Sequence, residues 1–77
     1  MILVCGEALI DLFVTRPGRS EMSARAVAGG SPFNVAIGLA RLGVRTAFLS
    51  GISRDHFGAF LVDRLAREGV GVGFLVR

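Results

Sequence analysis

Residues 29–43 read GGSPFNVAIGLARLG, a glycine pair followed at once by the signals that start a helix. Ser31 is a residue type favoured at the N-cap, and Pro32 is tolerated at the first helical position. The apolar residues recur at spacings of three and four, as on a helix with one buried face: Phe33, Ala36, Ile37 and Ala40. Gly43 is a typical C-terminal stop. The pattern predicts a helix over about Pro32–Leu42.

Apolar, strand-like runs flank this helix on both sides. Met1–Cys5 is closed by Gly6 and fits a strand that is buried on both faces of a parallel sheet. Thr46–Ser50 is a second such run, and its distance from the first permits a helical crossover between them. A parallel β-α-β unit is therefore expected.

A hairpin is predicted between the first strand and the helix. Arg16-Pro17-Gly18-Arg19 carries turn chemistry, because proline fixes φ and glycine allows positive φ. The segments at about Leu12–Thr15 and Met22–Ala28 are expected to pair across this turn.

A second helix and a third strand are predicted in the last third of the chain. Asp55 offers a cap for a helix over about His56–Arg67, which Gly69 would end. We expect four apolar residues on its buried face: Phe57, Phe60, Leu61 and Leu65. The opposite face carries two pairs of opposite charge at a spacing of four: Asp63 with Arg67 and Arg64 with Glu68. Val70–Val76 is the candidate third strand.

This order of elements is the opening of a doubly wound α/β sheet. The chain has 77 residues, of which 52% are hydrophobic and 19% charged, a composition too apolar for a disordered segment. Two or three parallel strands cannot close a core by themselves. We therefore expect the chain to be the N-terminal portion of a larger α/β protein.

The charge, cysteine content and hydropathy of the chain limit its expected partners and cellular compartment. Nine arginines oppose six acids for a net charge of +3, but the arginines are spread along the chain without a cluster and there is no Tyr or Trp. We therefore expect no nucleic acid partner. The single cysteine, Cys5, excludes an internal disulfide and is expected to be a buried, inert thiol in a reducing compartment. No apolar run reaches the length of a membrane span, so a cytoplasmic protein without a membrane partner is expected.

Common nucleotide and catalytic motifs are missing from the sequence. A Walker A loop requires lysine, which the chain lacks, and no Gly-x-Gly-x-x-Gly follows the first strand. His56, the only histidine, has no recognisable nucleophile and acid partners and is interpreted as a surface residue at a helix start.

Polar residues in this apolar chain suggest a binding site for a polyol. Asp11 follows the first strand, Gly29 and Gly30 form the bend, and Asn34 lies in the first helical turn. A carboxylate accepts hydrogen bonds from hydroxyls, a carboxamide both donates and accepts, and glycines let a sugar ring approach the backbone. The alternative is structural: Asp11 caps a turn, the glycines serve only the bend, and Asn34 faces water.

Four stretches of the chain together resemble the ribokinase-like (PfkB) carbohydrate kinases. They are Gly29–Ala36 (GGSPFNVA), Gly6–Asp11 (GEALID), Ala40–Gly43 (ARLG) and Asp55–Gly58 (DHFG). Their order along the chain is specific, and the GEALID start is similar to that of fructokinases. Ser53 departs from the family pattern, which usually has glycine there, and Arg54 stands where an acid is common.

The resemblance implies a ribokinase-like, Rossmann-type three-layer α/β sandwich with a small β lid at about residues 12–28, residues 1–77 being the N-terminal part of one kinase domain. It implies ATP-dependent phosphoryl transfer to a sugar hydroxyl, as in a fructokinase, with Mg²⁺ as a cofactor. By position, Asp11, Gly30 and Asn34 hold the sugar's hydroxyls and Gly29 helps to form the hinge of the lid.

The resemblance also limits what this chain does by itself. The family's catalytic Asp, anion hole and ATP pocket lie in its C-terminal half, and nothing in residues 1–77 matches them. No catalytic residue is therefore assigned here. A homodimer through the lid is a further implication. The alternative function is a noncatalytic sugar-binding or remnant module with a kinase-like fold.

Overall fold

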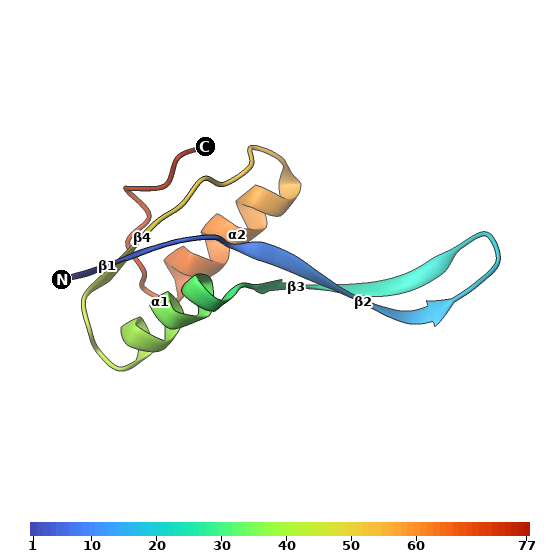
Figure 1. The fold of residues 1–77 in the computed structure, drawn as a ribbon, viewed down its shortest axis with the longest axis horizontal. Coiled ribbons are helices and arrows are strands. Elements are labelled where there is room, and N and C mark those ends of the chain that lie inside the picture. Colours follow the sequence, from blue (N-terminus) through green and yellow to red (C-terminus); the bar gives the residue numbers. More distant parts are fainter.

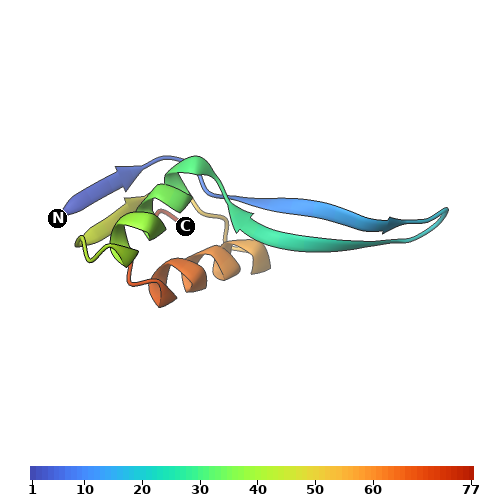
Figure 2. The same cartoon turned by 90° about the horizontal axis from the view of Figure 1, so that it is seen from below.

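The computed structural model describes the backbone of residues 1–77 and all side chains except that of Pro17. Its elements are β1 (Ile2–Cys5), β2 (Leu9–Pro17), β3 (Met22–Gly29), α1 (Ser31–Arg41), β4 (Thr46–Leu49) and α2 (His56–Arg67). A body of β1, β4 and the two helices carries the β2–β3 hairpin, which projects as a long arm (Figures 1 and 2). Neither described helix has the length and apolar character needed to cross a membrane.

The predicted parallel β-α-β unit is confirmed. β1 and β4 pair in parallel, with Ile2 opposite Thr46 and Cys5 opposite Leu49, and α1 packs against both strands. Gly43 ends α1 as expected: its φ is +84°, and its N–H donates to the Ala40 carbonyl.

The predicted start of α1 is wrong by one residue. The N-cap is Gly30, not Ser31, and no side chain makes a capping hydrogen bond in this helix. Ser31 is already the first helical residue, because Gly30 adopts a φ of +106° that a serine side chain would disfavour. The backbone demand of the bend therefore overrides the capping preference of Ser31.

One hydrophobic core joins both helices to one face of β4. Its buried residues are Phe33, Ala36, Ile37, Phe48, Ile52, Leu61, Leu65 and Val70. Phe33 of α1 and Phe48 of β4 meet edge to face, with ring centroids 6.3 Å apart and planes at 85°. Because α1 and α2 both contribute to this cluster, they cover the same face of the parallel strands.

The other face of the parallel strands is only partly covered, which corrects the expected burial of β1. Leu3 is 40% exposed and Leu49 38% exposed, and Cys5 is exposed instead of buried. Strand alternation places these three residues opposite Val4, which packs on the core. The described residues thus supply two layers of the expected three-layer sandwich.

The predicted hairpin is confirmed and is longer than expected. β2 and β3 pair from Leu9 opposite Gly29 to Pro17 opposite Met22, with a bulge between Val14 and Arg16. The sequence prediction began this ladder at Leu12 because the apolar alternation loosens after Ala8. The hairpin therefore reaches the glycine bend directly, without an intervening loop.

The predicted cap and bounds of α2 are confirmed, but its predicted buried face is only partly correct. The Asp55 carboxylate accepts a hydrogen bond from the Gly58 N–H at 2.9 Å. Leu61 and Leu65 are buried as expected, whereas Phe57 is 53% and Phe60 43% exposed. At this end of the helix the buried position is occupied by Gly58, which packs against the backbone of Ser53. The two phenylalanine rings therefore lie at the side of the helix, partly exposed to solvent.

The predicted strand at Val70–Val76 does not form. Only two isolated parallel bridges are present there, Ala47 with Gly71 and Gly51 with Val76. Between them the Leu75 N–H donates to the Val72 carbonyl at 3.3 Å, which makes a turn. This turn interrupts the ladder, so the segment lies beside β4 without becoming a continuous strand.

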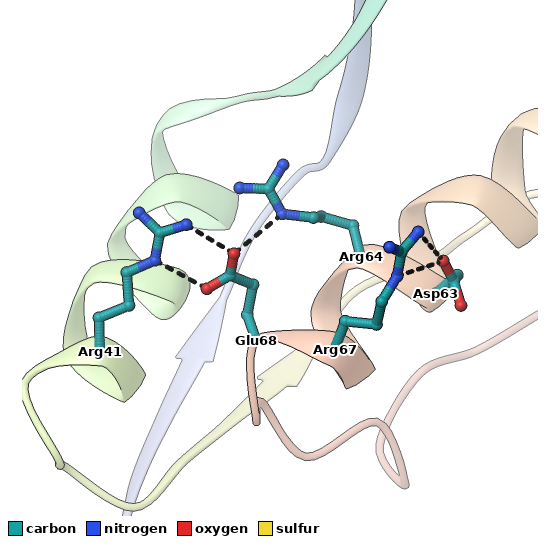
Figure 3. Close-up of polar contacts among 5 residues, drawn as sticks. All are labelled: Arg41, Asp63, Arg64, Arg67 and Glu68. Atoms are coloured by element: carbon teal, nitrogen blue, oxygen red, sulfur yellow. Dashed lines mark hydrogen bonds and ion pairs between the residues drawn. The ribbon is translucent and has the colours of Figure 1, made fainter.

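Glu68 ties the two helices together at their C-terminal ends (Figure 3). It accepts hydrogen bonds from Arg41 Nε at 2.7 Å and Nη2 at 2.6 Å, and from Arg64 Nε at 3.2 Å. The Arg41 hydrogen bond is the main cause of a lowered pKa of Glu68, and the charges of Arg41 and Arg64 add to it. The i,i+4 pairs of Glu68 with Arg64 and of Asp63 with Arg67 were expected from the sequence, but the link to α1 was not.

We predict that Glu68→Gln lowers the thermal midpoint of unfolding at pH 7. The midpoint of the variant should also fall less than that of wild type as the pH is lowered. Because the folded pKa of Glu68 is depressed, its ion pairs stabilise the fold fully above its ordinary pKa of 4.5 and are lost as the pH falls through the folded value. The gap between wild type and variant should therefore narrow as the pH falls below 4.5 and close once the pH has passed below the lowered pKa of Glu68, in thermal melts followed by circular dichroism. Glu21→Gln is the matched control, and an equal effect of that variant would contradict the assignment.

Candidate functional site

The base of the hairpin has two faces with different surroundings. Ile10 and Ala28 pack against the core on one face. On the other face the register sets Leu9 opposite Gly29, and Asp11 opposite Val27. Because side chains alternate along strands, Asp11 projects from the same face as the Gly29 position. The candidate site is this second face.

Gly29 is the point at which the Asp11 carboxylate meets the backbone. A Cβ built on Gly29 would lie 2.5 Å from Asp11 Oδ2, so a side chain there would have to displace the Asp11 carboxylate. Gly29 is buried, whereas Asp11 is exposed and has no ion pair among the described side chains. The glycine therefore lets the carboxylate lie across the end of β3, where its oxygens stay available to hydroxyl groups.

Gly30 makes the bend that joins the hairpin to α1. Its φ of +106° is strained for any residue with a side chain, and an added Cβ would lie 3.2 Å from the Glu7 carbonyl oxygen. The Gly30 carbonyl accepts the Asn34 N–H at 2.9 Å, which closes the first turn of α1. The two glycines thus have separate roles: one admits the carboxylate and the other turns the chain.

Asn34 lies on the exposed side of this first turn. Its neighbours Phe33, Ala36 and Ile37 are buried, while Asn34 itself is exposed. The structure therefore brings the four residues singled out by the sequence to one junction. Asp11 reaches Gly29, and Gly30 is hydrogen-bonded to the backbone of Asn34.

A second close approach at this junction was not found from the sequence. A Cβ on Gly6 would lie 2.5 Å from the Pro32 ring, so the end of β1 and the start of α1 are in contact. A glycine immediately after a strand is the only signal that pointed to it. His56 is exposed at the start of α2, as predicted, and lines a small hollow together with Ala26, Phe57 and Phe60.

The sequence pattern of the pfkB family of carbohydrate kinases matches residues 1–77. The chain belongs to this family. A fructokinase of Rhizobium leguminosarum bv. trifolii is 46% identical over 70 residues, which cover 91% of this chain and 22% of that protein. A 5-dehydro-2-deoxygluconokinase of Clostridium botulinum (strain Alaska E43 / Type E3) is 40% identical over 72 residues, 90% of this chain and 21% of the relative. The chain thus spans about a fifth of the length of these relatives.

The fold is also that of a solved sugar kinase. The crystal structure of fructokinase from Xylella fastidiosa superposes with a TM-score of 0.89 at 40% identity, covering 99% of this chain and 24% of that one. A second structure of the same enzyme has bound ATP. The ribokinase-like α/β fold expected from the sequence is therefore confirmed.

We predict opposite effects on stability for alanine at two glycines of this region. Gly30→Ala should destabilise the fold by about 1–3 kcal/mol, because the φ of +106° is unfavourable for alanine. Gly38→Ala is the matched control: its Cβ would meet nothing within 4 Å in mid-helix, so it should stabilise by about 0.5–1 kcal/mol. Urea unfolding measures both, and a neutral Gly30→Ala would contradict the role given to the bend.

Proposed function

We propose that this chain forms part of the sugar-binding site of an ATP-dependent sugar kinase. The observation that carries the proposal is the contact between the Asp11 carboxylate and Gly29, at the junction from which α1 presents Asn34. Asp11 would accept hydrogen bonds from two adjacent sugar hydroxyls, and the Asn34 carboxamide would donate to one oxygen and accept from another. Gly29 admits the carboxylate and Gly30 turns the chain into α1, so the two glycines would set both side chains against one sugar.

The start of α1 supports this proposal. No side chain caps the helix, so backbone N–H groups of the first turn, other than at Pro32, remain for a bound hydroxyl to satisfy. The exposed Asp11 and Asn34 make no side-chain hydrogen bonds to other described residues that would have to be broken on binding.

Phosphoryl transfer is supported by the relatives, since they are named as kinases of fructose and of 5-dehydro-2-deoxygluconate, and a similar fructokinase has been crystallised with ATP. In such a reaction this chain's residues would hold and orient the accepting hydroxyl. Positioning of the nucleophile supplies a large part of the rate enhancement in phosphoryl transfer. A fructose-like sugar is the first substrate to test.

We assign no ATP or Mg²⁺ site to this chain. Among the described residues there is no group of three or more His, Cys, Asp or Glu that is placed to hold a metal ion. We therefore derive no step through either cofactor. A second candidate function is a noncatalytic sugar-binding module that keeps the Asp11 junction without the chemistry.

The β2–β3 hairpin is proposed to be the lid over the sugar. It is anchored to the body at the glycine bend and extends away from it (Figure 1). It exposes large apolar side chains along its length: Leu12, Phe13, Val14 and Met22. Closure over a ligand, or pairing with the hairpin of a second copy in a homodimer, would bury part of this surface.

We predict that Asp11→Ala weakens sugar affinity at least tenfold. Losing hydrogen bonds to a charged group costs about 1.5–3 kcal/mol each. The measurement is isothermal titration with fructose, and ATP consumption on fructose, ribose and 5-dehydro-2-deoxygluconate is followed in parallel. The protein used is the product of the whole reading frame that contains these residues. Glu21→Ala, which changes a carboxylate at the far end of the hairpin, is the control.

Three outcomes separate the candidate functions. ATP turnover with a sugar, reduced by Asp11→Ala but not by Glu21→Ala, supports the kinase. Sugar binding without turnover supports the noncatalytic module. An affinity that Asp11→Ala leaves unchanged removes Asp11 from the site.

A further inference from the structure

Arg25 stands on the same face of the hairpin as Asp11. The register sets Arg25 opposite Phe13 and Val27 opposite Asp11, so these side chains all project from the face that holds the candidate site. Phe13 lies two positions after Asp11 in β2, which is about 7 Å along the hairpin. Arg25 therefore lies one step farther from the glycine bend than the carboxylate does.

The guanidinium of Arg25 is positioned by an aromatic ring. Its Cζ lies 5.8 Å from the centroid of Phe13, within the range of a cation–π contact. By contrast, the arginines within α1 and α2 are engaged with acids: Arg41 and Arg64 with Glu68, and Arg67 with Asp63. Among the described side chains, no carboxylate lies within 4 Å of Arg25. The contact with Phe13 leaves the hydrogen-bond donors of Arg25 unused by an acid.

Asp11 and Arg25 make the electrostatic potential of this face asymmetric along the hairpin. A ligand whose hydroxyls bind Asp11 would meet a negative group near the bend and a positive group farther along the hairpin. An anionic substituent on the sugar would be repelled by Asp11 and attracted by Arg25, so it would point outward. The planar guanidinium also matches a carboxylate or a phosphate with paired hydrogen bonds.

We propose that Arg25 is a specificity-determining residue that favours sugars carrying an anionic substituent over neutral sugars. This inference rests on the proposed sugar-kinase function and refines its substrate class. Carboxylate and phosphate share the chemistry that Arg25 recognises. The experiment therefore includes a sugar acid, a sugar phosphate and a neutral sugar.

The test compares kcat/KM for 5-dehydro-2-deoxygluconate, fructose 6-phosphate and fructose in the product of the whole reading frame. Arg25→Gln should lower the ratio of the preferred anionic sugar to fructose at least fivefold. Arg25→Lys keeps the charge but loses the paired hydrogen bonds, so its ratio should fall between those of wild type and Arg25→Gln. Arg16→Gln is the matched control, because it removes the same charge from the same hairpin near the tip. Added salt should also lower kcat/KM for the anionic sugar more than for fructose in wild type.

Each outcome decides between the hypotheses. A loss of anionic preference confined to Arg25→Gln supports the inference, and whichever anionic sugar shows it identifies a carboxylate or a phosphate as the recognised group. Turnover of fructose with no anionic preference, or an equal change in Arg16→Gln, overturns the inference and leaves the kinase proposal standing. No turnover of any sugar overturns both.

Discussion

The hairpin and helix α1 can meet as they do because Gly29 and Gly30 have no Cβ. At Gly29 the free space is taken by the Asp11 carboxylate, and at Gly30 the chain adopts a φ of +106° close to the Glu7 carbonyl. One constraint therefore sets the direction of the hairpin, the first residue of α1 and the place of a charged group. The lid and the sugar contacts that we propose both depend on this bend.

Local signals in the sequence predicted most of the elements. The Asp55 cap and the stops at Gly43 and Gly69 depend only on nearby backbone, so α2 lies where the pattern put it and α1 begins only one residue earlier than predicted. Burial was predicted less well, because it depends on what else packs. The sequence treats β1 as covered on both sides, but both helices lie on one face, and Cys5 is left exposed. The turn before Leu75 similarly breaks the third strand without any change in its β-rich composition.

Part of the candidate site could be predicted from the sequence. Asp11 and Asn34 are polar residues in an apolar chain, and the glycine pair between them resembles a family signature. Their meeting at one junction required the hairpin register, which sets Asp11 two residues beyond the Gly29 pairing. Arg25 drew no attention in the sequence for the same reason: its place on the face of Asp11 follows from a pairing between strands that the sequence pattern does not specify. The pairing register of β2 and β3, which composition does not determine, is what places these residues together.

The central claim is that Asp11 and Asn34 bind the same sugar across the glycine bend. A crystal structure of the protein with its sugar bound measures this most directly, through the distances from the sugar's hydroxyl oxygens to the two side chains. The account predicts that both the carboxylate and the carboxamide lie within about 2.6–3.2 Å of a hydroxyl oxygen. A sugar bound elsewhere, or held by only one of these side chains, would contradict it.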